Sequence, residues 1–178
     1  MVIKPMIRGG ICMNAHPEGC DLLVQKQIAY TTSRKESDGE IAGPKSALII
    51  GSSAGYGLAS RIAAAFGAGA GTLGIAFEKP ASKKRTATSG WYAMEAFDRK
   101  AREAGLLAET INGDAFSHET RQQAIARIKE LFGTVDLVVY SLASPVRTDP
   151  DSGEFYRSVL KPIGQDYTAT SVDPMKES

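Results

Sequence analysis

The chain has 178 residues, of which 43% are hydrophobic and 23% charged, a composition typical of one globular domain with a buried core. Lysine and arginine number 21 against 20 aspartate and glutamate, so the net charge of +1 gives no electrostatic argument for nucleic acid or a membrane as partner. No apolar run approaches the roughly 18 residues of a membrane span, and residues 1–10 lack the apolar core of a signal peptide, so we expect a cytoplasmic protein.

The N-terminal part is expected to form an extension, residues 1–45, ahead of the main fold at residues 46–178. Residues 1–29 contain aliphatic positions broken by glycine and proline, which predicts a short hairpin or loop and then a brief helix near residues 21–29. The polar residues 30–44 are expected to form a surface connection.

A Cys-x-x-x-His-x-x-x-Cys pattern in this extension, formed by Cys12, His16 and Cys20, raises the question of a metal site. Three ligands suit an open catalytic zinc site, but a structural zinc site needs four, and the only other histidine, His118, is distant in the sequence. We therefore predict no metal and two reduced cysteines.

The most informative stretch is an apolar run, a glycine turn and an alanine-rich segment. Residues 47–50 predict a buried strand and residues 58–66 a helix packed on it, with Gly51, Gly55 and Gly57 between them. We expect the first glycine to permit a turn that residues with a Cβ avoid, the second to let a pyrophosphate approach, and the third to let helix and strand pack closely. The free N–H groups of the helix's first turn complete a predicted phosphate site.

The glycine spacing, Gly-x-x-x-Gly-x-Gly, differs from the common dinucleotide fingerprint Gly-x-Gly-x-x-Gly, and no Gly-Lys-Ser/Thr follows to indicate a nucleoside triphosphate loop. It resembles the turn of short-chain dehydrogenases/reductases, which have a Rossmann fold. The alternative is an ordinary turn in a chain with 18 glycines. We favour the cofactor site because strand, turn and helix follow one another in the required order.

A second strand is predicted at residues 71–78, and it ends on an acid. In a Rossmann unit, an acid about 20 residues past the turn accepts hydrogen bonds from the adenine ribose hydroxyls. Glu78 occupies this position, and its carboxylate repels the 2′-phosphate of NADP, so NADH is the expected cofactor. Lys79 and the basic residues 83–85 leave NADP as the alternative, although most of this cluster is expected to be a solvated loop.

Apolar residues recur every three or four positions in residues 89–105, which predicts a helix, and residues 106–111 predict the third strand. Asp114 follows this strand, where an acid is placed to bond the adenine amino group; the alternative is a plain turn or helix cap. Ser117 is the predicted N-cap of a helix that runs to Leu131.

Residues 135–140 predict a fourth strand that is apolar on both faces, as in a parallel strand buried between helix layers. Small residues follow at 141–145, where the ribose and nicotinamide of a dinucleotide would pass. The predicted fold class is α/β, with about four strands that form the first half of a Rossmann-type, doubly wound parallel sheet. Without a second half, the fourth strand would lie at an open edge.

Longer strings carry a more specific signal, at residues 138–147, 90–92, 111–118, 3–5, 11–12, 16–17, 161–164 and 167–170. Over essentially the whole chain they closely resemble bacterial NADH-dependent trans-2-enoyl-CoA reductases, also described as enoyl-acyl-carrier-protein reductases, of the short-chain dehydrogenase/reductase superfamily. The resemblance implies reduction of the α,β double bond of a fatty enoyl thioester, carried on CoA or acyl carrier protein, in fatty acid synthesis.

The resemblance also implies a set of cofactor-binding positions. The glycine turn would hold the pyrophosphate and adenosine ribose, the end of the second strand the adenosine, the residues after the third strand the adenine, and those after the fourth strand the nicotinamide ribose. In that order the residues are Gly51, Ser52, Ser53, Ala54, Gly55 and Tyr56, then Phe77 and Glu78, then Asp114 and Ala115, then Leu142 and Ala143.

The catalytic residues that the resemblance implies, a tyrosine and a lysine in the pattern Tyr-x8-Lys, lie well downstream of this chain in the family. The superfamily's Tyr-x-x-x-Lys occurs nowhere in the sequence. Tyr167 and Lys176 have the x8 spacing, but Pro174 between them costs roughly 3 kcal/mol in a helix interior, so we do not assign them as catalytic. We expect a cofactor-binding portion that is inactive alone and whose partner is the missing C-terminal half. The alternatives are a short-chain dehydrogenase with another substrate and a non-catalytic NAD-binding module.

Overall fold

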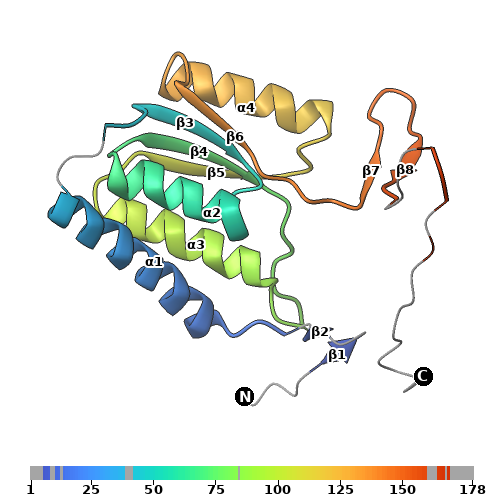
Figure 1. Ribbon diagram of the computed structural model, residues 1–178, viewed down its shortest axis with the longest axis horizontal. Helices are drawn as coiled ribbons and strands as arrows, with labels where there is room; N and C mark the ends of the chain where they lie inside the picture. The colour runs from blue at the N-terminus through green and yellow to red at the C-terminus, as the bar shows by residue number, and fades with distance from the viewer. Residues whose placement is uncertain are drawn as a thin grey trace.

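The computed structural model describes residues 6–8, 11–12, 14–38, 42–83, 85–159, 164–166 and 168. At its centre is a four-stranded parallel sheet in the order β5-β4-β3-β6 (Figure 1). The strands are β3 (Ser46–Ile50), β4 (Gly71–Ala76), β5 (Ala108–Asn112) and β6 (Leu137–Tyr140). The predicted α/β class, with the first half of a Rossmann-like sheet, is confirmed.

Helices cover both faces of this sheet. On one face lie α2 and α3, with α1 packed outside them, and on the other face lies α4 (Figure 1). Their bounds are α1 (Pro17–Asp38), α2 (Gly55–Ile62), which continues as a π-helical turn (Ala63–Gly67), α3 (Ser89–Glu103) and α4 (His118–Leu131). Two short antiparallel hairpins complete the described elements: β1 (Ile7–Arg8) with β2 (Ile11–Cys12), and β7 (Val146–Thr148) with β8 (Phe155–Arg157).

The core follows from the alternation of side chains along the central strand β3. Ala47 and Ile49 are fully buried on the face covered by α2 and its π-helical extension, where they pack with Ala64. Leu48 and Ile50 point to the other face and pack in the cluster beneath α4. Both faces are therefore apolar, as a strand covered on two sides requires.

The fourth strand, β6, pairs with β3 alone and lies at the edge of the sheet, as expected for the first half of a doubly wound fold. Its apolar side chains are partly uncovered: Val138 is 56% exposed and Tyr140 64%. The expectation of an open, apolar edge is confirmed, and burial between two helix layers holds only for the strands nearer the centre of the sheet.

The expected brief helix and polar connection at residues 21–44 are wrong, because α1 is a helix of 22 residues that continues to Asp38. Val24 anchors it in the cluster formed with α2 and α3. Beyond that anchor no glycine or proline interrupts the chain before Gly39, and serine hydroxyls bond carbonyls within the helix, as Ser33 does with Tyr30. Polarity indicated exposure here, but it did not exclude a helix.

The cysteine and histidine pattern lies at the start of α1. His16 Nδ1 accepts a hydrogen bond from Gly19 N at 3.0 Å, so the ring helps to cap the helix, while Cys12 is exposed. Among the described residues, no three histidine, cysteine or acidic side chains are grouped closely enough to hold a metal ion. No helix in the described part of the chain has both the length and the apolar character needed to cross a bilayer.

One buried cation ties α2 to the sheet and to α3. The Arg61 side chain is fully buried, lies 4.2 Å from the centre of the Phe97 ring and pairs with Asp98 at 3.1 Å. Its guanidinium donates hydrogen bonds to the Thr72 hydroxyl, the Thr110 hydroxyl and the Glu109 carbonyl. Burial lowers the pKa of Arg61 to about 10 against the opposing effect of Asp98, so the group stays charged at neutral pH.

Arg61→Ala should therefore lower the free energy of unfolding by about 3 kcal/mol, because it leaves the half-buried Asp98 carboxylate and polar groups of two strands without their partner. Arg99→Ala is the matched control, since Arg99 also pairs with acids but is 44% exposed and should cost less than about 1 kcal/mol. Urea denaturation of both variants measures the difference. Equal losses would contradict the structural role assigned to Arg61.

Candidate functional site

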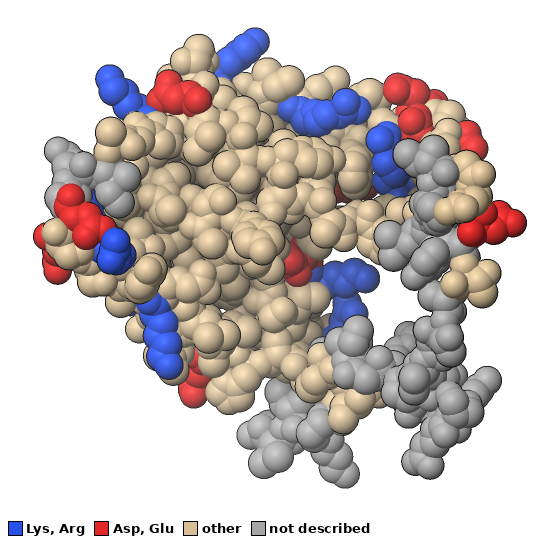
Figure 2. Space-filling view, viewed as in Figure 1, with Lys and Arg blue, Asp and Glu red and all other residues tan. Residues whose placement is uncertain are grey.

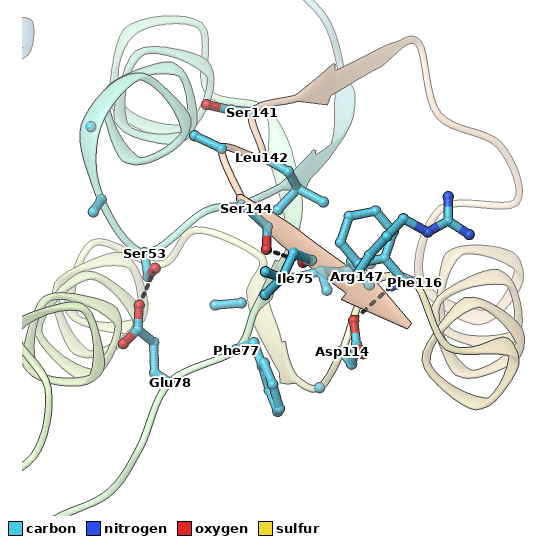
Figure 3. A pocket seen from close by; sticks show the side chains of 18 of the residues that line it. Ser53, Ile75, Phe77, Glu78, Asp114, Phe116, Ser141, Leu142, Ser144 and Arg147 are labelled. Atoms are coloured by element: carbon cyan, nitrogen blue, oxygen red, sulfur yellow. Dashed lines mark hydrogen bonds between the residues drawn. The ribbon is translucent and has the colours of Figure 1, made fainter. Parts of the chain in front are cut away.

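A groove of about 830 Å³ runs across the carboxyl ends of the four parallel strands. Loops after all four strands line it, which is where ligands bind in open α/β sheets (Figure 3). Of the twelve residues predicted to contact a cofactor, eleven line this groove: Gly51, Ser53, Ala54, Gly55, Tyr56, Phe77, Glu78, Asp114, Ala115, Leu142 and Ala143. The structure therefore brings together segments that are far apart in the sequence.

The glycine turn brings three stretches of backbone into contact. Gly51 has φ +87°, and a Cβ at this position would lie 2.1 Å from the carbonyl oxygen of Ser141, just after β6. A Cβ at Gly57 would lie 1.9 Å from the carbonyl oxygen of Gly51. The expected roles of these two glycines, a turn closed to other residues and close packing of helix on strand, are confirmed.

The start of α2 faces the groove without a side chain to cap it. The N-cap residue, Ala54, has extended backbone angles and no side-chain cap hydrogen bond. Gly55 follows with φ +52°, and a Cβ built there meets no atom within 4 Å, so this side of the turn is open. The N–H groups of the first turn are thus accessible to an anion, which would satisfy them in place of a cap.

Ser52 is the predicted residue that does not line the groove. It is fully buried, and both its amide and its hydroxyl donate to the carbonyl of Ile75, at 3.0 and 3.2 Å. The amide of Gly51 donates to the same carbonyl at 2.8 Å. Ser52 therefore fastens the turn to β4 from below, and its polar groups point away from a ligand.

Glu78 lies in the loop after β4, two residues beyond the end of the strand. Its Oε1 accepts a hydrogen bond from Ser53 Oγ at 2.6 Å, which links the loop to the glycine turn (Figure 3). The side chain of Asn112, at the end of β5, bonds both the amide and the carbonyl of Glu78, at 2.7 and 3.0 Å. A carboxylate is thus held at the groove with acceptor sites left for a ligand.

Asp114 lies on the far side of the groove, after β5. Its Oδ1 accepts from Phe116 N at 2.9 Å, so the side chain closes a local turn while it also lines the groove. The helix cap belongs to Ser117, whose hydroxyl accepts from Thr120 N at 3.1 Å. The predicted cap is confirmed, and both interpretations of Asp114 fit its position.

The β7–β8 hairpin forms a wall of the groove that our sequence reasoning missed. The guanidinium of Arg147 lies 5.0 Å from the centre of the Phe116 ring, and His118 Nε2 lies 2.6 Å from Asp151 in the hairpin turn. The available signal was the turn-forming sequence Asp-Pro-Asp-Ser-Gly at residues 149–153, which separates two short segments rich in β-forming residues.

Charges of both signs are distributed around the groove. Two acids, Glu78 and Asp114, line it together with two bases, Lys79 and Arg147. Lys83 and Arg85, a few residues after Lys79 in the sequence, are exposed. The face shown in Figure 2 likewise carries basic and acidic side chains interspersed, with no large region of one sign. The segment with Tyr167, Pro174 and Lys176 lies outside the described residues.

Comparisons with known proteins agree with this architecture. A family profile described as the NAD(P)H binding domain of trans-2-enoyl-CoA reductase matches residues 2–83, and one described as the trans-2-enoyl-CoA reductase catalytic region matches residues 85–178. The boundary between them falls in the loop between β4 and α3, so the sheet continues across it.

Individual relatives are similar over nearly the whole chain. An enoyl-[acyl-carrier-protein] reductase [NADH] of Edwardsiella ictaluri is 59% identical over 99% of this chain and 44% of its own length. The crystal structure of Treponema denticola trans-2-enoyl-CoA reductase in complex with NAD matches with a TM-score of 0.87 and 52% identity, over 98% of this chain and 44% of that one. The Clostridium acetobutulicum enzyme in complex with NADH matches with a TM-score of 0.87 and 39% identity, over 99% of this chain and 44% of that one.

The chain thus spans less than half the length of the relatives that it matches. Family profiles cover nearly all of it, and its sheet, glycine turn and groove are arranged as in a dinucleotide-binding fold. The chain belongs to the trans-2-enoyl-CoA reductase family.

Proposed function

We propose that this chain is the NADH-binding part of an enoyl-thioester reductase of the short-chain dehydrogenase/reductase superfamily. The observation that carries the proposal is the uncapped start of α2, opposite the carboxylate of Glu78 in one groove. An anion-binding helix end and an acceptor for ribose hydroxyls are the two features that a dinucleotide requires. The similarity to structures described with NAD and NADH bound supports the same cofactor.

The residues present fit this cofactor in size and chemistry. The open side of Gly55 leaves room for the pyrophosphate. The Glu78 carboxylate accepts from Ser53 and Thr88, and its two remaining acceptor sites suit the adenosine ribose hydroxyls. Asp114 and Ala115 would contact the adenine, and Leu142 and Ala143 the nicotinamide ribose. Ser52 acts indirectly, by holding the turn on β4.

The proposed activity is reduction of the α,β double bond of a trans-2-enoyl thioester, on CoA or acyl carrier protein, in fatty acid synthesis. Bound NADH supplies the hydride. The residues of this chain would bind and orient the cofactor, with the loop after β6, at the open edge of the sheet, holding its nicotinamide ribose. The catalytic donor to the developing oxyanion would come from the part of the enzyme that continues past that edge.

The proposed domain boundaries follow from assigning cofactor binding to this chain and the catalytic donor to a C-terminal half. We take residues 1–45 as an N-terminal extension and residues 46–178 as the cofactor-binding portion, with the rest of the sheet supplied by a C-terminal half. The exposed apolar side chains of β6 support this, because such a strand is normally covered in a doubly wound sheet. We also propose a cytoplasmic location, which fits this class of enzyme.

The cofactor assignment predicts that Gly57→Ala weakens NADH binding by at least about tenfold, or about 1.4 kcal/mol, in calorimetric titration. The new methyl group would push against the Gly51 carbonyl and distort the turn. Gly133→Ala is the control for a destabilising glycine substitution outside the groove: Gly133 has a positive φ, +75°, which Gly57 does not, so its replacement should cost about 1–2 kcal/mol of stability without changing affinity. Equal affinities of both variants would argue against the proposed site.

The enzymatic assignment predicts that the 178-residue protein binds NADH but does not oxidise it in the presence of crotonyl-CoA. A fusion of this chain to the part of the Treponema denticola enzyme beyond the matched region should gain turnover, measured as loss of NADH absorbance. Turnover by the chain alone would overturn the division proposed here. Tight NADH binding with an inactive fusion would favour a non-catalytic NAD-binding module.

A further inference from the structure

The hydroxyl of Thr88 does not cap the helix that follows it, α3. Thr88 is the N-cap residue of α3, a position where threonine normally bonds a free amide of the first turn, yet it makes no side-chain cap hydrogen bond. Its Oγ1 instead lies 2.5 Å from Oε2 of Glu78 and accepts from Lys79 N at 3.2 Å. The hydroxyl therefore serves the loop after β4.

A second feature at the same helix end makes room for the carboxylate. A Cβ at Gly90 would lie 2.0 Å from Oε1 of Glu78 and 2.4 Å from its Cδ, so no larger residue fits without moving the carboxylate. The backbone angles of Gly90 are not of the kind that demands glycine, since its φ is not positive. The need for glycine here comes from the acid that packs against it.

Together these contacts fix the Glu78 side chain on three sides. Thr88 donates to one carboxylate oxygen, Ser53 donates to the other, and Gly90 lies beneath both. The first turn of α3 also favours a negative charge at this place through its helix dipole. Asn112 holds the backbone of the same residue, so the whole acid is positioned before any ligand arrives.

We infer that Thr88 and Gly90 are positioning residues for Glu78 and that they set the discrimination between NADH and NADPH. This inference rests on the proposed function, because it names what controls the cofactor choice of that groove. A carboxylate on a flexible side chain rotates away when a 2′-phosphate arrives, which weakens the repulsion. A carboxylate held by Thr88 and packed on Gly90 cannot rotate away, so its electrostatic repulsion of the 2′-phosphate is stronger.

The test compares dissociation constants of NADH and NADPH by calorimetric titration of the purified protein. Thr88→Val keeps the shape of the side chain but removes the hydroxyl, and it should lower the NADPH-to-NADH ratio of dissociation constants about tenfold, as expected for loss of one charge-assisted hydrogen bond. Thr88→Ser should restore the wild-type ratio. Gly90→Ala, which displaces the carboxylate independently, should also lower the ratio.

Two controls separate positioning from general damage. Thr86→Val removes a hydroxyl from the same loop, one that accepts from Ala15 N at 3.0 Å outside the groove, and it should leave the ratio unchanged. In a Glu78→Gln background, Thr88→Val should no longer affect the ratio, because the residue that it positions has lost its charge. Circular dichroism establishes that each variant is folded.

The outcomes distinguish this inference from the function on which it rests. If the unaltered protein binds neither dinucleotide, the proposed function fails and the inference fails with it. If the unaltered protein prefers NADH, but Thr88→Val and Gly90→Ala weaken the binding of both cofactors equally and leave the ratio of dissociation constants unchanged, the inference alone is overturned. The same follows if Thr88→Val changes the ratio as much in the Glu78→Gln background as in the wild type.

Discussion

The groove depends on one close approach of backbones, between the turn after β3, the first turn of α2 and the chain leaving β6. Gly51 and Gly57 have no side chain because a Cβ at either would overlap a carbonyl oxygen, of Ser141 in the first case and of Gly51 in the second. This contact sets how near the helix start lies to the strand ends. One anion could therefore contact both the N-terminus of α2 and the carboxyl ends of the strands.

A second layer of contacts lies directly under the turn and keeps it in place. Ser52 bonds the carbonyl of Ile75, and Arg61 reaches from α2 beneath β4 to β5. Gly74 lies between them, and a Cβ there would come within 2.6 Å of both the Ser52 hydroxyl and the Arg61 guanidinium. The polar residues of this layer are buried and satisfied, so the floor of the groove is rigid without being wholly apolar.

Much of the fold was predictable because its strong signals are local. The apolar run before Gly51 and the spacing of apolar residues before Glu103 identify elements by periodicity alone. The extent of α1 was not predictable in this way, because its polar half has no apolar stripe and depends on packing of the first turns against α3. The β7–β8 hairpin itself had a local turn signal, but its place beside the groove depends on contacts with Phe116 and His118, which are distant in the sequence.

The site was predictable as a set of positions but not as a set of contacts. Spacing and family resemblance indicated Glu78, but they did not indicate that Thr88 and Ser53 hold its carboxylate or that Gly90 makes space for it. Glycine at a position without a positive φ is explained only by its neighbours in space. The position of the Glu78 carboxylate is therefore a property of four segments, of which spacing along the sequence indicates only the loop that carries the acid.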